Sequence, residues 1–195
     1  MITQTSAKHW LEVQMKKVLI AFLLIFATSH VYGYSNTQND VIKCSALYLI
    51  ASSTTSGIKN DETAMSYAGA QMAFEQIFAD LGNGKLKNRD ISIVKSKYMD
   101  WLGEAYDKKK RILYTVDTFC SNLGSIAITP LTSGDKKTYQ SIIKNLPKWA
   151  ADMKKIEKYD NSRKKWIDDI FAAWTAHGRL TPEKAKKNIR DSLVK

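Results

Sequence analysis

The sequence predicts an all-α fold, a disulfide-tied helical bundle with a basic C-terminal helical region. Apolar residues recur at spacings of three and four along most of the chain after residue 38, which is typical of amphipathic helices. The alternating pattern typical of strands is almost absent. Two cysteines, Cys44 and Cys120, each fall within such an apolar helical pattern, so both are expected to face one core.

The first 33 residues predict export. A short basic start at residues 15–17 precedes an uncharged, mostly apolar run at residues 18–28, and Val31 and Gly33 follow. This order is typical of a secretory signal peptide, with cleavage expected after Gly33. The run is well short of the ~20 residues that a membrane-spanning helix needs, so a membrane anchor or a core helix is the weaker alternative. We therefore expect a periplasmic or secreted protein, and residues 1–14 fit an upstream start.

Export bears directly on the two cysteines. An oxidising compartment favours a bond between Cys44 and Cys120. Two free thiols or a redox site are the alternatives, although the C-x-x-C spacing that redox sites use is lacking. A bond would close a long loop and tie together residues 34–127, which the periodicity predicts to be a three-helix unit.

Within this unit, the first two helices are short. One is expected from residue 39 to about 51, followed by a loop of small polar residues at 52–60. The second starts at residue 60 or 61 and ends before Gly82, and its apolar stripe includes Met65 and Met72, which we expect in the core.

The third helix is predicted from the longest apolar pattern in the chain. Helical spacing continues from Asp90 to Leu123, over about nine turns. Its interruption is the charged run at residues 107–111, where Lys109 falls on the apolar side and could lay its stem along the core. A break near Gly103 is the other possibility.

A linker is predicted at residues 128–136, which contain Pro, Gly and small polar residues. The basic helical region, residues 137–195, follows, and residues 101–195 together hold 20 basic and 11 acidic residues. Three helices are expected here: one at about 136–158, where Pro147 either kinks it or opens a new segment, one ending at Gly178, and one opening at Thr181. The region either packs on the first unit or extends from it.

The sequence carries no recognisable catalytic set, so we predict that the protein is not an enzyme. His177, the only histidine after the predicted cleavage, precedes a helix-ending glycine and can bond to free carbonyl groups there. The adjacent acids Asp168 and Asp169 diverge by about 100° on a helix and do not form a converging pair. Neither a metal nor any other cofactor is expected, because one histidine and a paired set of cysteines leave no ligand cluster.

The tryptophans of the basic region form the candidate interaction surface, because they alternate with lysines. The functional interpretation is a cationic aromatic surface, and the alternative is that the tryptophans face their own core while the lysines are solvated. The candidate residues are Trp149, Lys154, Lys155, Lys164, Lys165, Trp166 and Trp174.

These observations favour an exported, non-enzymatic binding protein of the cell envelope or extracellular space. It would act on another protein, as an inhibitor, an immunity-type partner or an accessory factor. The alternative is a cationic binder of anionic membrane lipid or cell-wall polymer through residues 135–195. Specific nucleic-acid binding is the least favoured for an exported chain, and nothing indicates a small-molecule ligand.

Overall fold

The computed structural model describes residues 34–56, 61–82, 88–155 and 161–181, together with Lys184 and Lys187. The predicted signal peptide, residues 1–33, lies outside the described residues, as does most of the helix predicted after Thr181. The chain divides into the units Met1–Tyr34 and Ser35–Lys195, and the fold below is that of the second unit.

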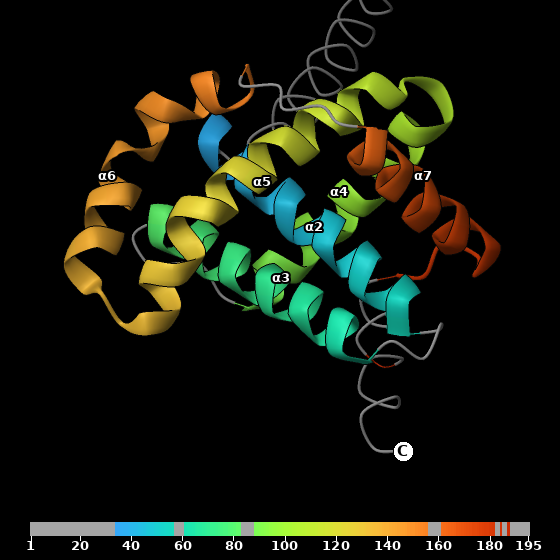
Figure 1. Ribbon diagram of the computed structural model, residues 1–195, viewed down its shortest axis with the longest axis horizontal. Helices are drawn as coiled ribbons and strands as arrows, with labels where there is room; N and C mark the ends of the chain where they lie inside the picture. The colour runs from blue at the N-terminus through green and yellow to red at the C-terminus, as the bar shows by residue number, and fades with distance from the viewer. Residues whose placement is uncertain are drawn as a thin grey trace, which may run out of the picture. The chain divides into compact units, whose positions relative to one another are not determined.

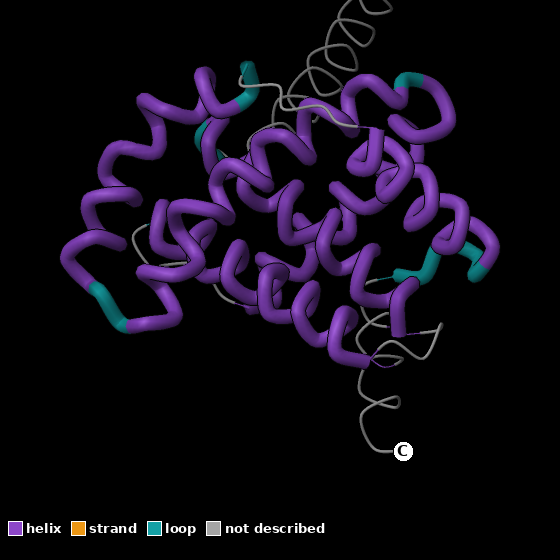
Figure 2. The backbone as a smooth tube through the Cα atoms, in the orientation of Figure 1, coloured by secondary structure: helices purple, strands orange, loops and turns teal. Residues whose placement is uncertain are grey.

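Helices make up nearly all of the described structure (Figure 2), and no strand occurs within these ranges, so the predicted all-α class is confirmed. None of the described helices combines the length and the apolar content needed to cross a membrane. The helices are α2 (Asn36–Ser56), α3 (Asp61–Leu81), α4 (Asn88–Lys108), α5 (Lys110–Ser133), α6 (Lys136–Met153) and α7 (Asn161–Ala176).

Helix α2 is the centre of the fold (Figure 1), and it packs against α3, α4, α5 and α7. Its side chains are buried almost all round, as expected of a helix with neighbours on several sides. Ser52, Ser53 and Thr54 are buried too, and their hydroxyl groups donate to backbone carbonyl oxygens. The prediction of a loop at 52–60 is therefore wrong for residues 52–56, because these bonds let small polar residues stay within a buried helix.

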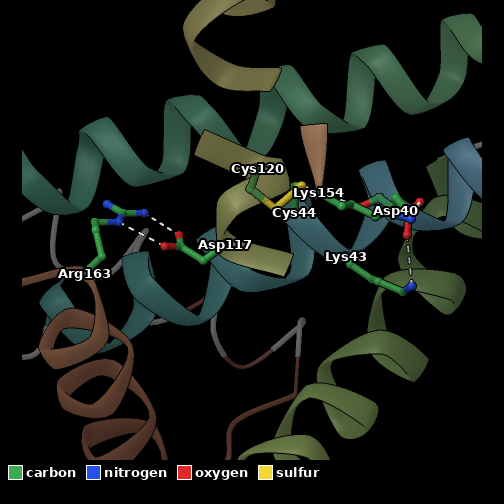
Figure 3. Close-up of a disulfide and its surroundings, with 7 residues drawn as sticks. All are labelled: Asp40, Lys43, Cys44, Asp117, Cys120, Lys154 and Arg163. Carbon is green, nitrogen blue, oxygen red and sulfur yellow. Dashed lines mark hydrogen bonds and ion pairs between the residues drawn. A yellow bond between two sulfur atoms is a disulfide. The ribbon is translucent and has the colours of Figure 1, made fainter. Parts of the chain in front are cut away.

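The predicted disulfide is confirmed: Cys44 of α2 is bonded to Cys120 of α5, and both residues are fully buried. The two sulfur atoms lie at the centre of Figure 3, between the two helices that they join. The bond closes a loop that contains all of α3 and α4.

The prediction of a single long helix over residues 90–123 is wrong, because the helix is interrupted at Lys109. This residue has φ −151° and ψ 60°, outside the helical region, and its side chain is exposed rather than laid along the core. A break near Gly103 does not occur either, since α4 continues through it. The charged run at residues 107–111 stays in solvent at the break, and α5 then packs against α2.

The predicted linker at 128–136 is also mostly helical, because α5 continues to Ser133 with Pro130 inside it. The helix ends at Gly134, whose φ of 76° suits glycine, and the Asp135 carboxylate accepts a bond from the Thr138 backbone N–H to cap α6. Pro147 lies inside α6 and does not open a new segment.

The basic helices pack on the disulfide-tied helices rather than extending from them. Helix α6 lies against α5, and α7 lies against α2 and α5. As predicted, α7 ends just before Gly178, which has φ 76°. Helix α3 buries Phe74 and Phe78, but Met65 and Met72 are 55% and 61% exposed, so their predicted place in the core is wrong.

Candidate functional site

Two adjacent hollows share Trp101 and Ile112, and together we call them the lysine-rimmed groove. The first has a volume of about 250 Å³ and is lined by residues of α2, α4, α5 and the turn after α6. The second, of about 220 Å³, lies where α4 meets α5. The first is lined by Asp40, Lys43, Trp101, Ile112, Thr115, Val116, Phe119 and Lys154, and the second by Trp101, Glu104, Ala105, Lys108, Lys109 and Ile112.

The floor of the groove follows from helical periodicity. Helix α5 supplies Ile112, Val116 and Phe119 at spacings of four and three, so these side chains share one face. Burial increases along this face, from Ile112, which is 37% exposed, to Phe119, which is 1% exposed. Trp101 of α4 borders both hollows and is half-buried.

One carboxylate holds two lysines at the rim of the first hollow. The Asp40 side chain pairs with Lys43 through Oδ1, at 3.2 Å, and with Lys154 through Oδ2. Figure 3 shows this cluster on one side of the disulfide. The Lys43 ammonium lies 5.1 Å from the centre of the Trp101 ring, and the Lys154 ammonium lies 5.9 Å from the centre of the Phe119 ring. Both cations are thus fixed beside the aromatic floor.

Tyr98 supports this cluster from α4. Its hydroxyl donates to Asn39 Oδ1 at 2.8 Å, and its ring lies 5.5 Å from the Lys43 ammonium. Burial, followed by the Asp40 charge, raises the pKa of Tyr98, so the hydroxyl remains a neutral donor.

The groove as a whole carries a positive charge. Its lining holds four lysines and two carboxylates, and one of those carboxylates, Asp40, is shared by two of the lysines. At the second hollow, Lys108 lies 3.9 Å from Glu104 in an exposed pair, which contributes little to the free energy of unfolding. The resulting surface is an apolar floor with cations at both ends.

The seven residues of the predicted interaction surface do not form one surface. Only Lys154 lines the groove. Lys155 and Lys165 are exposed and pair with Asp152 and Asp169 of their own segments, while Trp149 is 38% exposed on α6 and Lys164 is half-buried.

Trp166 and Trp174 instead pack the basic region onto the rest of the fold. The Trp166 Nε1 atom donates to the Tyr67 hydroxyl at 2.9 Å. Trp174 is 2% exposed and makes an edge contact with Phe171, whose ring stacks on Tyr106 of α4. These two tryptophans therefore do not face a core of the basic region alone, because their contacts include Tyr67 of α3 and Gly103 of α4.

An ion pair between the half-buried Arg163 and the buried Asp117 joins α7 to α5. Arg163 Nε donates to Asp117 Oδ2 at 3.0 Å, and its Nη2 pairs with Oδ1, on the other side of the disulfide from the Asp40 cluster (Figure 3). Burial raises the pKa of Asp117, although the bonds from Arg163 oppose this. The guanidinium also lies 4.3 Å from the centre of the Trp166 ring, so the pair belongs to a packed interface between helices.

A second ion pair joins α3 and α4. Lys95 is fully buried and pairs with Glu75, whose carboxylate also accepts bonds from Gln71 and Ser45. Since a buried cation without such partners would be very costly, this network is required for α3 and α4 to pack on α2.

The groove was not predicted from the sequence. Ile112 and Phe119 both lie within the apolar pattern of residues 90–123, which does not distinguish a partly exposed residue from a buried one, and no sequence pattern points to Lys43. The one available signal was the charged run at residues 107–111, which interrupts the longest apolar stripe and brings Lys108 and Lys109 to its end.

The described part of the chain contains no group of three or more His, Cys, Asp or Glu side chains that could hold a metal ion. Comparison with models of protein families, with curated proteins and with solved structures finds no significant match to this chain. The case for a function therefore comes from the groove itself.

Proposed function

We propose that the protein is exported and, without catalysing a reaction, binds another protein through the lysine-rimmed groove. The observation that carries the proposal is the placement of the Lys43 ammonium beside the half-buried Trp101 ring, in a hollow that the partly exposed Ile112 also lines. Tryptophan and other large side chains dominate protein interfaces when they lie in pockets that exclude water. Because Asp40 already fixes Lys43 and Lys154, the groove loses little conformational freedom when a partner binds.

The size of the hollows also favours a protein partner. Pockets for small-molecule ligands usually have volumes of about 300–1,000 Å³. Taken singly, the hollows are smaller than this, at about 250 and 220 Å³, and each can take a side chain of a larger partner. Such a protein could serve as an inhibitor, an immunity-type partner or an accessory factor of the envelope.

Export is supported by two features of the chain. Residues 1–33 have the order of a signal peptide, and the compact unit begins at Ser35, next to the predicted mature N-terminus. A disulfide is compatible with an oxidising compartment.

Site-specific photocross-linking in living cells tests the proposal. A benzophenone amino acid in place of Ile112 should give a discrete protein adduct in the envelope fraction or the medium. The matched control is the same amino acid in place of Ile93, which is 45% exposed on α4 but lies outside both hollows. Equal adducts at the two positions, or none at Ile112, would count against the groove as the binding site.

A second candidate is binding of an anionic membrane or polymer through the basic region. Helix α6 carries Lys137, Lys144 and Lys148 at spacings of seven and four, so they share one face, and all three are exposed. Binding through these solvated lysines should weaken steeply between low and physiological ionic strength. Charge reversal at Lys144 and Lys148 should abolish it without changing the adduct at Ile112.

A further inference from the structure

We infer that the groove receives an acidic amphipathic helix, which places one apolar side chain in each hollow. This inference rests on the proposed function and specifies the chemistry of the partner. Trp101 and Ile112 line both hollows and therefore form the wall between them. A partner that fills both hollows must present two apolar groups, one on each side of this wall.

The two hollows are close enough together for two neighbouring side chains of one helix. They share Trp101 and Ile112 among their lining residues, so they lie directly next to each other where α4 meets α5. Side chains at positions i and i+4 of a partner helix are about 6 Å apart.

A helix also suits the walls of the groove. An extended peptide gains affinity by adding to the edge of a sheet, where unpaired backbone groups are available. The described lining of the groove consists of helices, of the helix break at Lys109 and of the turn at Lys154, so it offers no sheet edge to an extended peptide. A helical partner satisfies its own backbone and needs only side-chain contacts, as amphipathic helices do in apolar grooves.

The charge of the groove selects an acidic partner. Lys43 and Lys154 border the first hollow, and Lys108 and Lys109 border the second. Aspartates and glutamates on either side of the two apolar anchors would meet these cations. A partner with lysines there would be repelled, which gives specificity as well as attraction.

Designed peptides test the inference on the protein expressed from its full coding sequence. The probe is a helical peptide of about 15 residues with two leucines four positions apart and glutamates around them. One control peptide replaces each glutamate with lysine, and another replaces both leucines with alanine. Binding is measured by calorimetry and by the shift of the Trp101 indole N–H signal in an NMR spectrum.

We expect the acidic peptide alone to bind and to shift the Trp101 signal. Ile112→Asp, and separately Lys108→Glu with Lys109→Glu, should each raise its Kd about tenfold or more. These positions are exposed, so the melting temperature should hardly change, and this should be measured alongside. The matched controls, Ile93→Asp and Lys144→Glu with Lys148→Glu, lie outside the groove and should leave the Kd unchanged.

Several results would overturn the inference. These are equal binding of the lysine peptide, loss of binding in the α6 control variant, or a shift of the Trp101 signal by anionic phosphatidylglycerol vesicles. If a protein adduct forms at Ile112 in cells while the acidic peptide does not bind, the inference fails and the proposed function stands. If neither occurs, both fail.

Discussion

Gly103 of α4 lies against the indole of Trp174, at a point where even a methyl group would be crowded. A Cβ atom at position 103 would lie 3.1 Å from Cζ3 of the indole and 3.0 Å from an Arg179 guanidinium nitrogen. Non-bonded carbon atoms prefer separations of about 3.5–4.0 Å, so one of these groups would have to move. Arg179 is itself held by Asp107 Oδ1, 2.6 Å from its Nη2. The glycine therefore lets α4 approach the C-terminal end of α7.

Gly103→Ala should consequently destabilise the protein. Overpacking of a filled site costs about 1–3 kcal/mol, more than alanine gains over glycine in a helix. The matched control is Gly69→Ala in α3, where nothing lies within 4 Å of an added Cβ. That change should raise the free energy of unfolding by about 0.5–1 kcal/mol. Thermal melts of both variants give the test, and two changes of the same sign would contradict it.

Trp174→Ala should lower the free energy of unfolding by about 3–5 kcal/mol, since it removes a large, fully packed side chain. The melting temperature should fall by several degrees or more. Trp149→Ala provides the comparison, because that side chain is 38% exposed and its loss should change the free energy of unfolding by no more than about 0.5 kcal/mol. An unchanged melt of monomeric Trp174→Ala protein would refute the packed position of α7.

Removing the disulfide should lower the free energy of unfolding by a similar amount. The bond joins residues 76 positions apart, and in the chain-entropy model a loop of this size stabilises the folded state by about 4–5 kcal/mol. Denaturant unfolding of Cys44→Ser with Cys120→Ser should show this loss, and reduced wild-type protein should behave alike. A non-reduced digest should contain the linked peptides, whereas two thiols that can be alkylated in the native protein would contradict the bond.

Asp117 should give stability a distinctive dependence on pH. Burial raises the pKa of this carboxyl in the folded protein above its unfolded value of about 3.9. From about pH 4 up to the folded pKa, the folded state binds more protons, so the contribution of Asp117 to the free energy of unfolding falls as pH rises. Asp117→Asn removes this titration. The free energy of unfolding of the wild type minus that of the variant should therefore fall as pH rises from about 4 to the folded pKa.

Asp107→Asn is a control for which stability should change with pH in the opposite direction. The hydrogen bond from Arg179 lowers the pKa of Asp107 below its unfolded value. The free energy of unfolding of the wild type minus that of the variant should therefore rise with pH, from the folded pKa to about pH 4. Denaturant unfolding at a series of pH values measures both differences, and two slopes of the same sign would contradict the assigned shifts.

Export predicts a mature N-terminus at Tyr34 or within a few residues of it. N-terminal sequencing of protein recovered from the envelope or the medium measures this directly. A product that retains residues 18–26 would contradict cleavage by a signal peptidase.

Local patterns predicted the helical class, the cysteine pair and the end of α7. These depend on periodicity and on a glycine at a helix terminus, which act within a few residues. Phe171 and Trp174 belong to the buried face of α7, together with Ile167 and Ile170. Its packing partners, Tyr106 and Gly103, lie about 70 residues away, and no local pattern points to them.

The wrong loop prediction at residues 52–56 and the failure to predict the groove have physical causes. Ser52 and Thr54 favour loops when solvated, but burial leaves their hydroxyl groups only helix carbonyls to bond with. The groove was missed because periodicity shows which face of a helix is apolar and not how far a neighbour covers it. Ile112 and Phe119 share one stripe, yet only Phe119 is fully covered.

The disulfide also determines how the fold bears force. Pulling on the two ends of the chain loads the backbone up to Cys44, passes through the sulfur atoms to Cys120 and continues into α6 and α7. The intervening segment is bypassed, so at about 3.4 Å per residue the fully stretched oxidised chain is roughly 260 Å shorter than the reduced one. Tension between the two chain ends would thus be carried by α2 up to Cys44 and by the chain from Cys120 onward, while α3 and α4 lie outside the covalent path that bears it.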